Sequence, residues 1–197
     1  MTTFIFKSAL HAVRLLPALL LTACASTPPD DGTRISRNPD NGLLTYSKDE
    51  NGFSIELIQV VPDFIRAVYA NHSFPEDVIE DIAAYCVYGS VIKNTSGKPL
   101  RYRVADWYYV LDGERHPVKT KTQWLQQWRQ RGIVFSWTLL PDAGDFYQGD
   151  WQQGFTTVKA PRGSRFDFHY SWTVDGEPRH AVLSDMQCPP EHVKVPS

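Results

Sequence analysis

The most constraining feature of the chain is a strict alternation of apolar and polar residues near its carboxyl end. Every second position from 166 to 174 is apolar or aromatic, and the positions between them are polar. The alternating residues are Phe166, Phe168, Tyr170, Trp172 and Val174. Because successive side chains of a strand point to opposite faces of a sheet, this pattern predicts a strand with one buried and one wet face. Such strands are typical of antiparallel sheets, so a second layer must cover the aromatic face.

Further short strands, separated by turn residues, predict a mainly β fold. Residues 43–47 and 53–60 flank a polar turn and form an expected hairpin. Strand character is also found at residues 85–93, 100–104, 107–111, 133–140, 155–158 and 180–185. The expected architecture is an antiparallel, immunoglobulin-like β-sandwich of about seven or eight strands.

Two or three short helical insertions interrupt this pattern. Residues 62–84 carry apolar side chains at helical spacing and restart after Ser73, which predicts two short helices. Thr120 and Gln123 have the spacing of a capping box, and the helix that they begin is expected to continue to Arg131. Trp124, Leu125 and Trp128 would share its apolar face.

The amino terminus has the layout of a bacterial export signal. Residues 1–23 combine two basic residues with an apolar run, and they are too short to act as a stop-transfer helix. The run ends in Leu21-Thr22-Ala23-Cys24, which resembles the lipobox of bacterial lipoproteins. That resemblance implies cleavage before Cys24 and attachment of acyl chains to it, which together would anchor the protein stably. The alternative is an ordinary secretory signal cleaved near Ala23.

Lipidation would set both the location and the organisation of the mature chain. Ala25 follows the cysteine, and the lipoprotein resemblance then implies sorting to the outer membrane, on its periplasm-facing side. Residues 24–42 are rich in Pro, Asp, Ser and Gly and are expected to form a lipidated flexible tether. The sandwich domain is expected over residues 43–197. The net charge is −2, and −4 once the two basic residues of the signal are removed, so nucleic acid is not an expected partner.

A second resemblance concerns the domain itself. Residues 91–100 form a strand that ends in an Asn-Thr-Ser-Gly-Lys-Pro turn, and a later strand closes in Asp112-Gly113. These segments, with residues 148–164, are similar to immunoglobulin-like domains of unknown function in bacterial lipoproteins and secreted antigens. The resemblance covers about half of the mature chain. It implies a fold and supplies no catalytic residues.

Cys86 and Cys188 are the two thiols that remain after Cys24. In an exported protein two cysteines usually pair, which predicts a structural disulfide. The alternatives are free buried thiols or, with least support, a reactive thiol, because the chain has no CxxC motif.

His169 and His180 are candidate metal ligands. A two-residue turn at Asp175-Gly176 would pair position 171 with 180, which makes the two imidazoles diagonal neighbours on the polar face. With Asp167 they could hold Zn²⁺ or Cu²⁺. The alternative is a solvated sheet face without a metal, and no cofactor is expected.

The tryptophans are the candidate ligand-binding residues. Trp107 and Trp151 lie beside polar loop residues and form the expected surface pair, which could stack on a glycan or contact a protein. Trp124, Trp128 and Trp172 are expected to contribute to the core. All six lie in one stretch of the chain, at positions Trp107, Trp124, Trp128, Trp137, Trp151 and Trp172.

The sequence contains no motif for catalysis. A G-x-S-x-G elbow, an HExxH pair, a P-loop and a dinucleotide fingerprint are all absent from it. We therefore expect a non-enzymatic envelope lipoprotein, a module that binds a protein partner or assists an envelope complex. The two alternatives are a glycan- or peptidoglycan-binding module using Trp107 and Trp151, and a weak Zn/Cu-binding periplasmic protein using His169 and His180.

Overall fold

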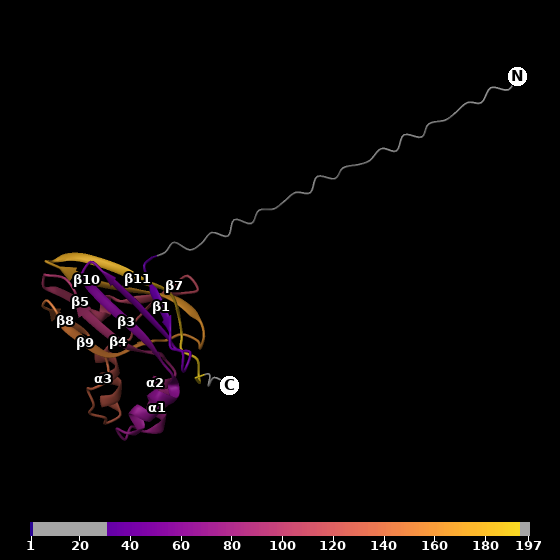
Figure 1. Ribbon diagram of the computed structural model, residues 1–197. Coiled ribbons are helices and arrows are strands. Elements are labelled where there is room, and N and C mark those ends of the chain that lie inside the picture. Colours follow the sequence, from indigo (N-terminus) through magenta and orange to yellow (C-terminus); the bar gives the residue numbers. More distant parts are fainter. Residues whose placement is uncertain (2–30, 194–197) are drawn as a thin grey trace.

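The computed structural model describes Met1 and residues 31–193. Its strands form two antiparallel sheets, and its three α-helices gather at one end of them (Figure 1). The elements in chain order are β1 (Arg34–Arg37), β2 (Leu44–Glu50), β3 (Phe53–Val60), α1 (Pro62–Ala70), α2 (Glu76–Ala83), β4 (Cys86–Asn94), β5 (Leu100–Arg103), η1 (Val104–Asp106), β6 (Tyr108–Leu111), β7 (Glu114–Pro117), α3 (Lys121–Gln130), β8 (Ala143–Phe146), β9 (Trp151–Val158), β10 (Arg165–Val174) and β11 (Glu177–Gln187).

The first sheet, here called sheet A, has the strand order β1-β2-β3-β4-β9. The second, sheet B, contains β5 to β8 together with β10 and β11. Within sheet B, β5 and β6 pair with different parts of the same long strand β10, and the short 3-10 turn η1 separates them. β11 pairs with the other edge of β10.

The core lies between the two sheets and follows from the alternation in the sequence. β3 buries Phe53, Ile55 and Leu57, and β10 buries its aromatic positions in the same alternating way. Phe53 of sheet A stacks on Trp172 of sheet B with ring centroids 5.0 Å apart. The predicted mainly β sandwich is therefore confirmed, and the part of the chain that the structure covers contains eleven strands rather than seven or eight.

The helices cover part of the outer face of sheet A and form a second apolar cluster. α1 and α2 contribute residues such as Tyr69 and Ile82, and α3 contributes Trp124 and Trp128, all of them fully buried. Val87 of β4 belongs to this cluster, whereas its neighbour Tyr88 points into the core between the sheets. The indole nitrogen of Trp124 donates to Thr157 Oγ1 of β9 at 2.9 Å, which ties α3 to sheet A.

Two local predictions are confirmed in detail. Thr120 caps α3, since its hydroxyl accepts from the Gln123 backbone N–H while the Gln123 side chain accepts from the Thr120 backbone N–H. Cys86 and Cys188 form a disulfide.

Two other expectations are wrong. Residues 34–37, placed in the flexible tether, form β1 and pair with β2, and Asp31 accepts from the Ser184 hydroxyl at 2.7 Å. The folded domain therefore begins well before residue 43. Residues 133–140 do not form a strand, since Leu139 makes only a single parallel bridge to Phe155.

Candidate functional site

Trp107 and Trp151 do not form the expected surface pair. Trp107 is 1% exposed, packs among core aromatics and donates its indole N–H to the Ser171 carbonyl at 3.0 Å. The turn η1 shifts the strand pattern just before it and places the indole between the sheets, although Asp106 next to it is exposed. The prediction that Trp107 is exposed for ligand binding is therefore wrong.

Trp151 is exposed and belongs to a different surface, the outer face of sheet A. It is 58% exposed at the start of β9. Gln153 and Phe155 follow at every second position and point to the same side, because side chains alternate along a strand. Gln152, between them, faces inward and accepts from the Tyr102 hydroxyl at 2.6 Å. β9 thus presents Trp151 and Gln153 to solvent, whereas Phe155 is half-buried against the helical cluster.

A shallow groove of about 380 Å³ runs beside Gln153 and Phe155. Gly89 of β4 lies between Ile58 of β3 and Phe155 of β9 in the strand register, and its missing side chain leaves the hollow. We call this surface the sheet A groove. It is lined by Ile58, Gly89, Ser90, Val91, Thr138, Gln153, Gly154 and Phe155.

One wall of the sheet A groove is a strained segment. Thr138 has φ +67°, a left-handed value that is uncommon for a β-branched residue. Its carbonyl accepts from the Phe155 N–H at 2.6 Å, and its hydroxyl is hydrogen-bonded to the hydroxyl of Tyr69 at 2.8 Å. Strain of this kind persists only where the surrounding structure holds it, and it is concentrated at functional sites.

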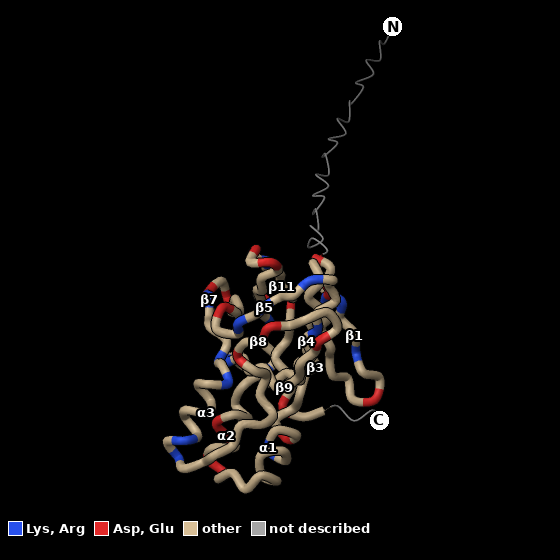
Figure 2. Tube along the Cα trace, turned by 90° about the vertical axis from the view of Figure 1, so that its left-hand side faces the viewer, with Lys and Arg blue, Asp and Glu red and all other residues tan. Residues whose placement is uncertain are grey.

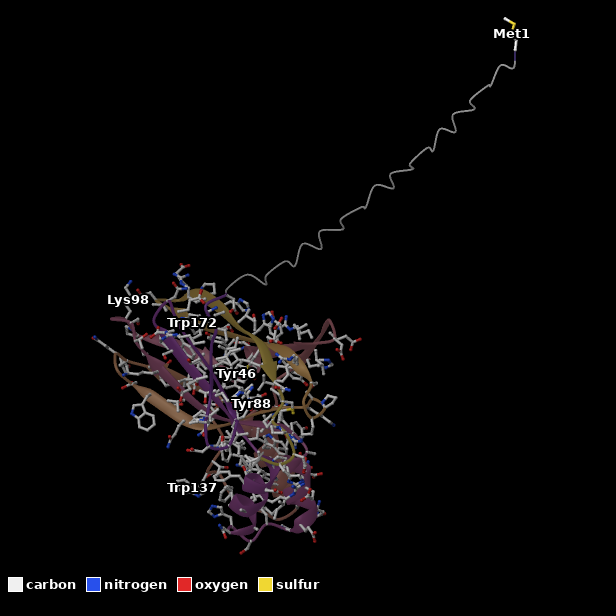
Figure 3. All side chains as sticks on the ribbon, turned by 45° about the vertical axis from the view of Figure 1, so that its right-hand side comes forward. Met1, Tyr46, Tyr88, Lys98, Trp137 and Trp172 are labelled. Carbon is white, nitrogen blue, oxygen red and sulfur yellow. A yellow bond between two sulfur atoms is a disulfide. The ribbon has the colours of Figure 1, made fainter. Side chains whose placement is uncertain are left out.

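Trp137, directly before Thr138, is the functional candidate that the sequence analysis missed. It is 72% exposed. Figure 3 shows it at the side of the molecule, near the helices and away from Tyr46, Tyr88 and Trp172. The prediction of a strand over residues 133–140 gave no reason to expect an exposed Trp137, because alternate side chains of such a strand are assigned to the core. Two exposed tryptophans therefore lie close in sequence to residues that line the sheet A groove: Trp137 directly before Thr138, and Trp151 on β9 two positions before Gln153.

Charge does not single out one face of the domain. Basic and acidic residues are interspersed along the described chain (Figure 2). Many of them pair on the surface, as in the Arg66 contacts to Asp63, Glu80 and Glu191. Such exposed pairs contribute little to stability individually.

A second hollow, of about 370 Å³, contains a perturbed lysine. The Lys119 ammonium lies 3.2 Å from the centroid of the Trp124 ring and donates to Gln127 Oε1 at 2.6 Å. Burial lowers the pKa of Lys119 to about 8, an effect that nearby Asp81 partly opposes. Its cation–π contact accounts for its position within the fold.

The predicted neighbourhood of His169 and His180 is confirmed. Ser171 pairs with His180 across the hairpin, and His169 Nδ1 lies 3.1 Å from His180 Nε2. Asp167 instead accepts from the backbone N–H of Asp185 at 2.9 Å. Within residues 31–193, no group of three or more His, Cys, Asp or Glu side chains is arranged to hold a metal ion.

The described chain thus defines a two-sheet, mainly β domain with a helical cap and an aromatic-flanked groove. No family model matches the chain, and no curated protein does so. A solved structure from Bacillus subtilis, described as a "putative lipoprotein", aligns with 79% of this chain at 9% identity and a TM-score of 0.34. This chain covers 39% of the length of that protein. A likeness this low assigns neither family nor function.

Proposed function

We propose that the protein is a non-enzymatic, lipid-anchored binding module outside the cytoplasm, and that its ligand docks in the sheet A groove. The observation that carries the proposal is the position of two exposed tryptophans relative to residues that line the groove. Trp151, 58% exposed, is on the same face of β9 as the groove residue Gln153, and Trp137, 72% exposed, directly precedes the groove residue Thr138. Tryptophan is among the residues that contribute most of the binding energy at recognition surfaces.

The anchor and compartment rest on two features. The Leu21-Thr22-Ala23-Cys24 sequence supplies the lipid attachment site, although Cys24 lies outside the described residues. The Cys86–Cys188 disulfide supports an oxidising compartment, where such bonds form and persist. In the segments that the structure describes, no helix is long and apolar enough to cross a membrane. We place the domain on the periplasmic side of the outer membrane.

The exposed tryptophans near the sheet A groove, together with its polar lining residues, favour a glycan as the ligand. A tryptophan face carries partial negative charge and packs well against the C–H groups of a sugar ring. The exposed amide of Gln153 supplies a polar group for sugar hydroxyls. The groove is open and shallow, as suits a segment of a polymer such as peptidoglycan. A protein partner, favoured by the exposed Ile58, is the rival occupant.

Cosedimentation with purified cell-wall sacculi tests the ligand. The purified protein should pellet with sacculi, and Trp137→Ala and Trp151→Ala should each reduce the bound fraction several-fold. Phe64→Ala is the matched control, because Phe64 is 54% exposed on α1, and no residue of that helix lines the groove. Equal pelleting of all variants, or none by the wild type, would reject the glycan and leave the protein partner as the occupant.

Membrane fractionation tests the anchor separately. A Cys24→Ser variant should lose incorporation of labelled fatty acid and move from the membrane to the soluble fraction. A variant that still incorporates fatty acid would contradict lipidation at Cys24.

A further inference from the structure

The outer face of sheet B carries a stacked column of four side chains, each from a different strand. The Arg115 guanidinium of β7 lies 3.6 Å from the Tyr108 ring centroid of β6. Tyr108 stacks on His169 of β10 at 4.4 Å, with an interplanar angle of 8°. His169 stacks in turn on His180 of β11 at 5.3 Å. The column belongs to the opposite sheet from the groove, and the proposed ligand binding does not use it.

The two histidines bring one nitrogen each to the same point. His169 Nδ1 and His180 Nε2 are 3.1 Å apart. Two imidazole nitrogens bound to one Zn²⁺ at about 2.0–2.1 Å and separated by this distance subtend about 100° at the metal. That angle lies between the square-planar and tetrahedral values, which are the geometries that Cu²⁺ and Zn²⁺ adopt.

We propose that His169 Nδ1 and His180 Nε2 form a two-imidazole binding site for a divalent transition metal, with Cu²⁺ bound most tightly. Nitrogen sites of fixed geometry prefer Cu²⁺ over Zn²⁺ and Ni²⁺. Since the described chain supplies two ligands and no cluster of three, water or a ligand from outside completes the coordination. The metal displaces the proton that lies between the two nitrogens, and that proton moves to the other nitrogen of the ring that carried it, so each imidazole keeps one N–H.

Charged neighbours also surround His169. Burial, followed by the neighbouring His180, lowers the pKa of His169, and Arg115 acts in the same direction. The carboxylate of Asp167 opposes this shift and places a negative charge near the site. The carboxylate of Asp167 would offset part of the charge of a bound cation.

The site is also held in shape before any metal binds. Tyr108 covers one face of the His169 ring, and Arg115 lies on the far side of Tyr108. The register that places His180 is fixed by the two-residue turn at Asp175-Gly176, where both residues have positive φ values. Ligands on paired strands lose little freedom when they bind, which favours affinity.

Calorimetric titration of the full-length protein in detergent with Cu²⁺ tests the site, with electron paramagnetic resonance as a second readout. One equivalent should bind with a nitrogen-coordinated Cu²⁺ spectrum, and Zn²⁺ should bind more weakly. His180→Ala changes an exposed side chain and should keep the fold while weakening Cu²⁺ binding at least about tenfold. Tyr108→Leu should weaken binding less, because it removes only the cover on His169.

His72→Ala is the matched control, since His72 is also exposed and packs on an aromatic ring, that of Phe135. It should leave the tight equivalent unchanged. The proposal is overturned if wild type and His180→Ala bind Cu²⁺ equally, or if His72→Ala lowers the affinity as much as His180→Ala does.

Discussion

Cys86 and Cys188 are joined by a disulfide that connects the first residue of β4 in sheet A to the residue after β11 in sheet B. Both residues are fully buried, and 102 positions separate them in the sequence. Arg162 approaches Cys188 and donates to the backbone carbonyls of Tyr85 and Ala83. The bond therefore fastens the two sheets together next to the helical cap.

Removing this disulfide should lower the stability of the domain markedly. A cross-link that closes a loop of this length contributes about 4–5 kcal/mol in the chain-entropy model, and measured losses are typically about 2–5 kcal/mol. The Cys86→Ala/Cys188→Ala double variant should therefore unfold at a clearly lower urea concentration than the wild type. An unchanged urea midpoint would show that the sheets hold together without it.

Gly154→Ala should destabilise the edge of sheet A. A Cβ at this position would lie 2.3 Å from Leu140 N and 2.5 Å from the Leu139 carbonyl carbon, so backbone must move. Overpacking of this kind costs about 1–3 kcal/mol. Gly97→Ala is the control, because nothing lies within 4 Å of its Cβ position, and it should be close to neutral. Urea unfolding compares the two variants, and equal midpoints would show that the backbone of residues 139 and 140 does not lie this close to Gly154.

Two buried tyrosines should respond differently to loss of their hydroxyls. The Tyr88 hydroxyl donates to the Gln187 carbonyl at 2.7 Å, so Tyr88→Phe should cost about 0.5–1.5 kcal/mol. The Tyr170 hydroxyl has no partner among the described residues, so Tyr170→Phe should be neutral or slightly stabilising. Thermal unfolding of both variants measures the difference, and a larger loss for Tyr170→Phe would reverse the expectation.

Lys119 should make stability depend on pH in the alkaline range. Burial lowers its pKa to about 8 in the folded chain from a usual value of 10.5. Between these pH values the unfolded chain binds more protons, so the stability of the folded state rises with pH through this window. The free energy of unfolding of the wild type, measured relative to that of Lys119→Met, should therefore rise from pH 8 towards pH 10.5. A constant difference, measured by urea unfolding, would mean that Lys119 titrates normally.

The parts of the fold that local chemistry determines could be predicted from the sequence. The alternation ending in Trp172 and Val174 identifies β10, and the Thr120–Gln123 capping box identifies the start of α3, because both patterns use neighbouring residues. The pairing of Cys86 with Cys188 follows from the compartment and from the small number of thiols.

The parts that long-range packing determines were not predictable in the same way. The apolar run before Leu140 has the composition of a strand, but only the contacts of Thr138 with Tyr69 and β9 fix its irregular path and expose Trp137. β1 is exposed along its whole length, so no apolar pattern marks it. The burial of Trp107 depends on the η1 turn, whose position is set by pairing with β10.

The central claim is that the sheet A groove binds a cell-wall glycan through Trp137 and Trp151. Tryptophan fluorescence titrated with soluble peptidoglycan fragments tests it most directly, because these two exposed indoles are the ones that would contact the ligand. The emission should change saturably with ligand, and this change should be reduced in Trp137→Ala and in Trp151→Ala and preserved in Phe64→Ala. An emission spectrum that stays constant up to millimolar ligand would contradict it.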